Sequence, residues 1–116
     1  MKVVAKSTRG LAANVHVPAA NTAAVVTYAA APANWHQVIS GLAWGYNGAP
    51  TNGSIVILSG AVPIFSIPIT SAGPGFIPFD PPQAGIDAAT MTVTLAAGGG
   101  VVEGRLNVLG HFVEQT

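Results

Sequence analysis

The sequence contains no cysteine and very few charged side chains. The absence of cysteine excludes disulfide bonds, thiolate metal sites and cysteine nucleophiles. Only four basic and four acidic residues occur among 116, whereas 50% of the residues are hydrophobic. A folded monomer of this mass exposes roughly 5,800 Å², and a soluble domain usually has charge on about a quarter or more of its surface residues. We therefore expect other copies of the chain to cover part of an apolar surface.

Long uninterrupted hydrophobic runs are also missing. The longest run, residues 55–69, contains serine, glycine and proline and falls short of the about 20 residues that a membrane helix needs. Near the start, Lys6 and Arg9 end the apolar stretch after Met1-Lys2 too early for the hydrophobic region of a secretory signal peptide. We expect a chain that does not enter a membrane and is not exported by a signal peptide.

Motifs that would indicate an enzyme or a nucleic-acid-binding protein are absent. The sequence has no phosphate-binding Gly-x-x-x-x-Gly-Lys loop, no Gly-x-Gly-x-x-Gly, no His-Glu-x-x-His and no Gly-x-Ser-x-Gly. Four basic residues are too few to follow a phosphate backbone, and no aromatic residues alternate with them. We therefore predict a protein without enzymatic activity, without a cofactor and without a nucleic-acid partner.

Two groups of titratable residues leave an alternative open. Asp80 and Asp87 lie in a segment rich in proline and glycine, where a role in turns explains them more simply than a catalytic carboxylate pair. The three histidines, His16, His36 and His111, lie on three separate segments. A three-histidine metal site, as in a cupin-like metalloenzyme, usually includes a His-x-His pair, which is missing here. We predict no catalytic site and no metal site.

The basic residues are concentrated at the start of the chain. Lys2, Lys6 and Arg9 give residues 1–9 a charge of +3, and the remainder carries −3. We predict an N-terminal arm over residues 1–21, in which these three residues contact an acidic partner or a neighbouring subunit. The alternative is a terminus that is simply solvated. Residues 22–116 are predicted to form the folded domain.

Alternation of apolar and polar residues predicts strands throughout that domain. Short strands at a spacing near ten residues, with turn residues between them and no convincing helix, predict an all-β antiparallel β-sandwich of about eight strands. The long middle strands and non-repeating loops favour a jelly roll over an immunoglobulin-like fold. The expected strands cover residues 25–28, 35–46, 55–58, 62–70, 76–79, 91–95 and 103–112. We expect Asp80-Pro81-Pro82 to end the strand at 76–79.

The strand over 35–46 has one face of large residues and one of small residues. A period of two places Val38, Leu42, Trp44 and Tyr46 toward the core, whereas Ile39, Gly41, Ala43 and Gly45 face outward and allow another backbone to approach closely. Aromatic residues expected in the core are Tyr28, Trp44, Tyr46, Phe65 and Phe112. Stacking of Tyr28, Trp35, Trp44 and Tyr46 on sugars is the alternative interpretation.

Several segments carry a family resemblance. WHQVISGLAWGY (35–46) followed by PTNGS (50–54), ITSAGPGFIPF (69–79) and TVTLAAGG (92–99) resemble segments of small virion proteins of tailed bacteriophages, namely trimeric jelly-roll decoration (cement) or head-fibre proteins. The resemblance covers roughly residues 22–113.

This resemblance implies a homotrimer that binds the major capsid protein on the outer capsid surface of a virion and stabilises the capsid. It supplies no catalytic residues. The alternative function is a receptor- or carbohydrate-binding domain of a phage tail or host-range fibre.

Overall fold

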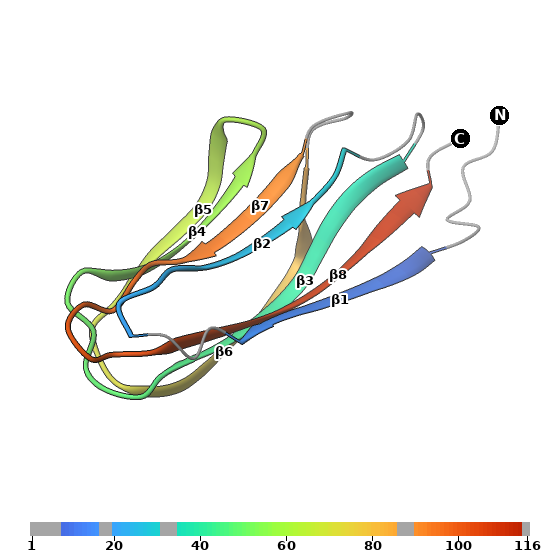
Figure 1. The fold of residues 1–116 in the computed structure, drawn as a ribbon. Helices are drawn as coiled ribbons and strands as arrows, with labels where there is room; N and C mark the ends of the chain where they lie inside the picture. Colours follow the sequence, from blue (N-terminus) through green and yellow to red (C-terminus); the bar gives the residue numbers. More distant parts are fainter. Residues whose placement is uncertain (1–7, 17–19, 31–34, 86–89, 115–116) are drawn as a thin grey trace, which may run out of the picture.

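The computed structural model describes residues 8–16, 20–30, 35–85 and 90–114 (Figure 1). Its eight strands are β1 (Thr8–His16), β2 (Ala24–Tyr28), β3 (Trp35–Tyr46), β4 (Gly53–Ser59), β5 (Val62–Ile69), β6 (Gly73–Ala84), β7 (Met91–Leu95) and β8 (Gly104–Glu114). The described part of the chain has no helix long and apolar enough to cross a membrane. The predicted all-β class is confirmed.

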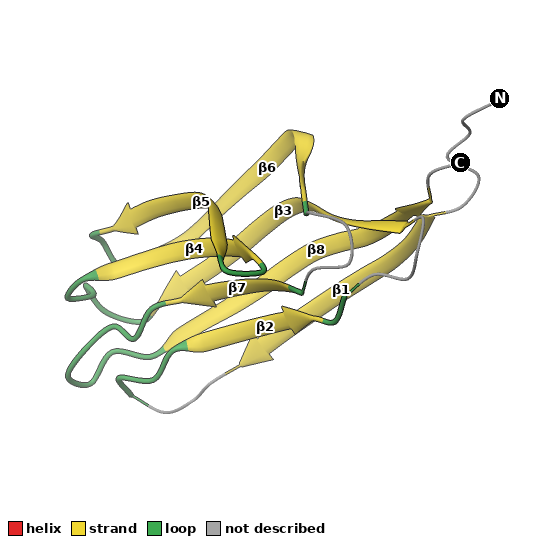
Figure 2. Cartoon of the chain, turned by 90° about the horizontal axis from the view of Figure 1, so that it is seen from above, coloured by secondary structure: helices red, strands yellow, loops and turns green. Residues whose placement is uncertain are grey.

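The strands form two antiparallel four-stranded sheets that pack face to face (Figure 2). Sheet A has the order β1-β8-β3-β6, and sheet B has the order β2-β7-β4-β5. Among the described connections the chain passes from one sheet to the other, except at the β4–β5 hairpin. Two interlocked four-stranded sheets of this order form a jelly roll, so the predicted fold is confirmed.

The hydrophobic core lies between the sheets, where alternate side chains of each strand face inward. Sheet B shows this alternation clearly, since β4 and β7 are buried at every second residue. Sheet B contributes more of the described core cluster than sheet A. Its residues are Ile39, Leu42, Tyr46, Phe79, Leu106 and Val108 from sheet A, and Ala24, Val26, Tyr28, Ile55, Ile57, Ile69, Met91, Val93 and Leu95 from sheet B or its ends.

A bulge in β3 changes which residues face the core. The register of β3 with both β6 and β8 shifts between Ile39 and Gly41. A bulge places one extra residue in a strand and so reverses the alternation beyond it. Ile39 is therefore fully buried in the core cluster, whereas Val38 is buried, with 9% of it exposed, but does not belong to that cluster. The predicted outward position is wrong for Ile39. The predicted burial holds for Val38, Leu42 and Tyr46, and Trp44 packs against the cluster.

Strand β6 is longer than the sequence predicts. The prolines after Asp80 were expected to end it, but β6 runs to Ala84, with a cis bond between Asp80 and Pro81. β6 is the edge strand of sheet A and pairs with β3 alone. Proline lacks an N–H group, and an edge strand tolerates this because half of its backbone groups have no strand partner. Position in the sheet, which local sequence does not reveal, explains the error.

Part of the predicted N-terminal arm belongs to the sandwich. Thr8–His16 forms β1, which pairs along its whole length with β8 at the edge of sheet A. Residues 1–7 and 17–19 lie outside the described residues. The predicted boundary between arm and domain at residue 21 is therefore too late in the chain, because Thr8–His16 already belongs to the domain. The predicted attachment role of the arm stays a prediction.

The loops at one end of the sandwich are joined by backbone hydrogen bonds. Asn21 N–H donates to the Val102 carbonyl at 2.9 Å, and Thr51 N–H donates to the Gly98 carbonyl at 2.8 Å. Gly99 and Gly100 both have positive φ angles, and Val102 N–H donates to the Gly99 carbonyl at 2.9 Å. Glycine is used here because the turn needs left-handed backbone. The loops at this end of the domain are thus held to one another by backbone hydrogen bonds.

Candidate functional site

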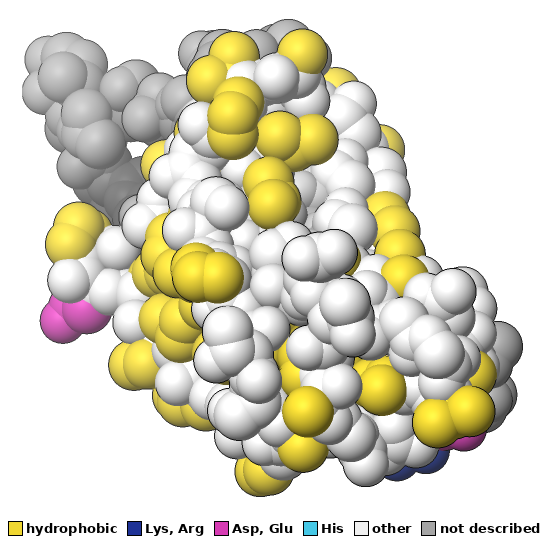
Figure 3. Space-filling model, turned by 90° about the vertical axis from the view of Figure 1, so that its left-hand side faces the viewer, with side chains coloured by type: hydrophobic (Ala, Val, Ile, Leu, Met, Phe, Trp, Pro, Cys, Tyr) yellow, Lys and Arg dark blue, Asp and Glu magenta, His cyan; other side chains and the backbone are white. Residues whose placement is uncertain are grey.

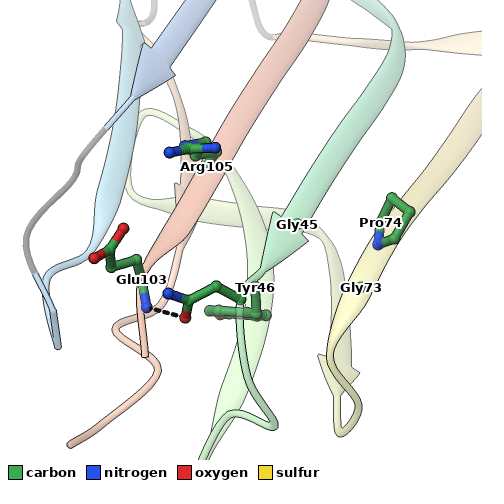
Figure 4. A pocket seen from close by; sticks show the side chains of 7 residues that line it. Gly45, Tyr46, Gly73, Pro74, Glu103 and Arg105 are labelled. Carbon is green, nitrogen blue, oxygen red and sulfur yellow. Dashed lines mark hydrogen bonds between the residues drawn. The ribbon is translucent and has the colours of Figure 1, made fainter. Parts of the chain in front are cut away.

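A shallow pocket lies at the loop end of sheet A. Its volume is about 330 Å³, and its walls come from the end of β3, the start of β6 and the start of β8. The register explains this grouping, because Gly45 pairs with Arg105 on one side and with Pro74 on the other. Figure 4 shows Gly45, Gly73 and Pro74 on one side of the hollow, and Glu103 and Arg105 on the other.

Hydrogen bonds hold the wall of this pocket in place. Asn47 N–H donates to the Glu103 carbonyl at 3.0 Å, and Glu103 N–H donates to Asn47 Oδ1 at 2.8 Å. Behind them, the Tyr46 hydroxyl donates to the Ala96 carbonyl at 2.6 Å. Burial raises the pKa of Tyr46, and a backbone hydrogen bond with Ser54 acts in the opposite direction. Exposed Arg105 gives the pocket a cation that suits a carboxylate, but the described lining offers no nucleophile paired with a base.

A second hollow lies on the open side of the sandwich next to Trp44. It has a volume of about 240 Å³ and is formed mainly by the end of β5, the following loop and the start of β6. Gly75 lies under the indole, since a Cβ placed there would be 2.3 Å from Trp44 Cζ2. The half-buried ring therefore rests on backbone and borders the hollow. An aromatic ring beside a hollow is a common feature of sugar-binding surfaces.

The outer face of sheet A is apolar over its centre. Register places Leu109, Gly41 and Pro78 in one row across β8, β3 and β6, with Asn107, Ala43 and Phe76 in the next row. The apolar residues of these two rows are called the apolar face below, and they are Leu109, Gly41, Pro78, Ala43 and Phe76. Phe76 is 58% exposed and Leu109 is 47% exposed. Their side chains reach over Gly41, where a Cβ would lie 3.4 Å from Phe76 Cε1 and 3.5 Å from Leu109 Cδ1.

The outer face of sheet B is different. It alternates hydroxyl-bearing residues with β-branched and leucine side chains, and the strands of sheet B contain no Asp, Glu, Lys or Arg. The hydroxyl face, as we call it, consists of Thr27, Ser54, Ser66, Thr92 and Thr94. Hydroxyl groups can both donate to and accept from water. Sheet B can therefore face solvent without charged residues.

Charged side chains are sparse on the surface that Figure 3 shows. That view, of the loop end, is dominated by hydrophobic and uncharged polar side chains, with basic and acidic atoms confined to small areas at its margins. Within the described side chains, the cation is Arg105, and the carboxylates are Asp80 and Glu103. Asp80 lies exposed on β6, and Asp87 lies outside the described residues. That Asp80 and Asp87 do not form a catalytic carboxylate pair therefore stays a prediction.

The residues predicted to bind a capsid are only partly described. Lys2 and Lys6 lie outside the described residues. The backbone of Arg9 lies in β1 and pairs with Phe112 of β8. The side chains of β1 are not among those described. The structure therefore locates Arg9 at a sheet edge and leaves the binding role of all three residues a prediction.

The five aromatic residues predicted for the core take different positions. Tyr28 and Tyr46 belong to the core cluster, and burial raises the pKa of Tyr28 to about 12. Trp44 and Phe65 are partly buried and pack against that cluster. Phe65 meets Phe79 edge to face, with ring centroids 4.9 Å apart. The side chain of Phe112 is not described.

The three histidines lie on three neighbouring strands of sheet A. His111 pairs with Val38, so His36 lies two residues further along the adjacent strand. His16 pairs with Arg105, six residues from His111 along β8. At about 3.3 Å per residue, that separation is roughly 20 Å. The backbone thus brings two histidines near each other and keeps the third away, which disfavours a shared three-histidine site.

The sequence predicted only part of the apolar face. The small residues of β3 indicated an outward face that a neighbour could approach, and Gly41 and Ala43 do lie there. Phe76 and Leu109 were missed because each comes from another strand. The signal that could have found Leu109 is its position, one residue out of phase with the buried Leu106 and Val108.

Comparison with known proteins gives the fold and no family. No protein-family model matches the chain, and no curated protein matches it. Part of dimeric latent PorU from Porphyromonas gingivalis aligns with 93% of this chain and 13% of its own, at 8% identity and a TM-score of 0.54. That likeness concerns the fold alone.

Two further solved structures align over most of both chains, with TM-scores below 0.5. A chain from the disulfide-linked pili of Bacillus endospore appendages aligns over 95% of this chain and 88% of that one, at 16% identity and a TM-score of 0.45. The carbohydrate-binding module CBM36, solved with calcium and xylotriose, aligns over 100% and 93%, at 15% identity and a TM-score of 0.42. The function of the present chain is therefore argued from its own surfaces.

Proposed function

We propose that this chain is a structural protein of a bacteriophage virion, which binds the outside of the capsid as a homotrimer and stabilises it without enzymatic activity. The observation that carries the proposal is the apolar face on a jelly-roll domain, which gives copies of the chain an uncharged surface for association. The segments that resemble decoration and head-fibre proteins lie in β3, around β6 and in β7 of this same domain.

The domain suits a role as a capsid clamp. A jelly roll whose end loops are hydrogen-bonded to one another forms a stiff body. Three copies joined together would engage three capsid sites at once, and simultaneous engagement raises overall avidity well above that of one weak contact. The partners proposed are other copies of the chain and the major capsid protein. The proposed location is the capsid surface of the virion.

The proposed capsid contacts are Lys2, Lys6 and Arg9. Lys2 and Lys6 precede β1 in the sequence, and Arg9 is its second residue. Basic side chains clustered within nine residues would attract an acidic capsid surface, and salt would screen that attraction.

The test is to co-express the chain with the major capsid protein encoded in the same genome and to separate capsids on a density gradient. The expected result is that the protein sediments with the capsids and raises the temperature at which they open. A protein that stays at the top of the gradient at low and moderate salt would contradict the proposal.

Charge-reversal variants refine this test. Lys2→Glu combined with Lys6→Glu should weaken capsid binding and its salt dependence while leaving the fold intact, because both residues precede β1. Glu103→Lys is a charge reversal of the opposite sign near the other end of the sequence and should not weaken capsid binding. Deleting residues 1–20 is a poorer experiment, since it removes β1 and its pairing with β8.

The alternative function is carbohydrate or receptor binding in a phage tail or host-range fibre. The hollow beside Trp44 favours it, because the indole is partly accessible there. Screening the purified protein on a glycan array decides between the two. Binding that disappears in Trp44→Ala, with Trp35→Ala as a second aromatic variant and circular dichroism unchanged in both, would support the alternative. An array without binding supports the structural role.

A further inference from the structure

We infer that the apolar face of sheet A is buried against a second copy of this chain. The inference rests on the self-association in the proposed function and names the surface that makes it. In a homotrimer this face would turn toward the three-fold axis and contact both neighbours.

The shape of the apolar face suits contact with another sheet. Gly41 is buried beneath Phe76 and Leu109, and Ala43 lies beside it, so the two large side chains rise from a low floor. Sheets pack face to face about 10 Å apart when such side chains interdigitate. A large residue on one copy can therefore enter the low area over the small residues of another copy.

One polar group at the centre of this face is already engaged within the chain. The Ser40 hydroxyl, next to the bulge, donates to the Leu109 carbonyl at 3.2 Å. The five residues of the apolar face have no side-chain donor or acceptor of their own. Covering these five residues buries no polar side chain of their own, whereas the half-buried Asn107 beside Ala43 would need a hydrogen-bond partner on the other copy.

Charge also favours a copy of the same chain as the occupant. Among the described side chains near the apolar face, Arg105 and Glu103 line the same pocket at one end of it, so this surface carries few charges and both signs. A strongly basic or acidic partner would gain little from so few charges of mixed sign. A copy of the same chain brings an apolar surface that is equally poor in charge.

The outer face of sheet A is comparable in area with one side of a stable protein interface. A four-stranded face with strands about 4.8 Å apart and about ten residues long covers about 600 Å² before side-chain relief is counted. A stable interface buries about 800 Å² on each partner. The outer face of sheet A is therefore comparable in area with one side of such an interface, and the apolar face occupies part of it.

The test compares one substitution on each sheet. Leu109→Lys places a charge on the apolar face, and Val25→Lys does the same on the outer face of sheet B, where Val25 is 44% exposed. Sedimentation velocity is run at micromolar concentrations, and circular dichroism checks the fold. We expect oligomers for the wild type and Val25→Lys, and at least about a tenfold weaker association for Leu109→Lys.

A second variant protects the test against a folding defect. Phe76→Ser removes an exposed ring without adding charge, and we expect the same direction of change. Oligomers that persist in Leu109→Lys and Phe76→Ser, or that dissociate in Val25→Lys alone, would overturn the inference. Such a result would leave capsid binding untouched, whereas a monomeric wild type would also remove the self-association from the proposed function.

Discussion

The two sheets have the same kind of inner face and different outer faces. Sheet A carries Phe76 and Leu109 above a floor of glycine and alanine, whereas sheet B carries five hydroxyl side chains and no charge within its strands. Hydroxyl groups let sheet B hydrate its outer face, although Val25 and Val62 are also exposed on that sheet. In the two rows of the apolar face of sheet A, the polar side chain is Asn107. The two outer faces, both poor in charge, therefore differ in how they avoid exposing apolar surface to water. Hydroxyl groups hydrate sheet B, and we propose that another copy covers sheet A.

The edge strands divide differently, since each sheet has one edge with prolines and one edge without them. The edge strands β5 and β6 contain prolines, Pro63 and Pro68 in β5 and four in β6, which block the addition of another strand. The edge strands β1 and β2 contain none. The prolines therefore disfavour association through the β5 and β6 edges.

The largest expected loss of stability distinguishes the inner face of β8 from its outer face. Leu106 is fully buried and Leu109 is 47% exposed, and both lie in β8. Leu106→Ala should lower the free energy of unfolding by about 2–5 kcal/mol at any protein concentration, because it leaves a cavity. Leu109→Ala should lower stability only through weaker association, so its effect should vary with protein concentration. Urea unfolding at several concentrations checks this, and equal concentration dependence in the two variants would contradict it.

A smaller effect should distinguish two glycines of sheet A. A Cβ at Gly75 would lie 2.3 Å from the Trp44 ring, whereas a Cβ at Gly45 would lie 3.8 Å from the Gly73 carbonyl oxygen, its nearest neighbour across the strands. Gly75→Ala should therefore cost about 1–3 kcal/mol of stability through crowding. Gly45→Ala is the matched control and should change the free energy of unfolding by less than about 0.5 kcal/mol. Similar urea midpoints for the two variants would show that Trp44 does not rest on Gly75.

The burial of Tyr28 on the inner face of sheet B should make the stability of the fold depend on pH in the alkaline range. Burial raises the pKa of Tyr28 from 10.0 to about 12. Between these values the unfolded chain loses the phenolic proton and the folded chain keeps it, so stability is full below pH 10 and falls as the pH rises toward 12. The expected loss is on the order of 1–2 kcal/mol. Tyr28→Phe should make thermal stability less dependent on pH in this range, and an unchanged slope would contradict the assignment.

The smallest effect is expected on the hydroxyl face. Thr94 is half-buried on the outer side of β7, opposite Val25 and Val56. Thr94→Val should change the free energy of unfolding by less than about 0.5 kcal/mol and leave sedimentation unchanged, because no partner is expected there. Weaker association in Thr94→Val would place sheet B, and not sheet A, at the contact between copies.

Local sequence was most informative where a strand is surrounded by others. The strands at 35–46 and 91–95 were predicted at the bounds that β3 and β7 have, because clear alternation or dense β-branching reflects burial between the sheets. At the edges it was less informative. Pro81 ended the expected strand but not β6, and residues 8–16 were assigned to an arm although they form β1.

Composition and periodicity by themselves determined that this protein is an all-β jelly roll with an under-charged surface, since strand alternation and scarcity of charge are properties of the chain alone. Only the tertiary structure decided that Ile39 faces the core and that Phe76 and Leu109 converge over Gly41. The bulge and the strand order that cause this arise from pairing between segments far apart in the sequence. Such pairing leaves no trace in the pattern of any one strand.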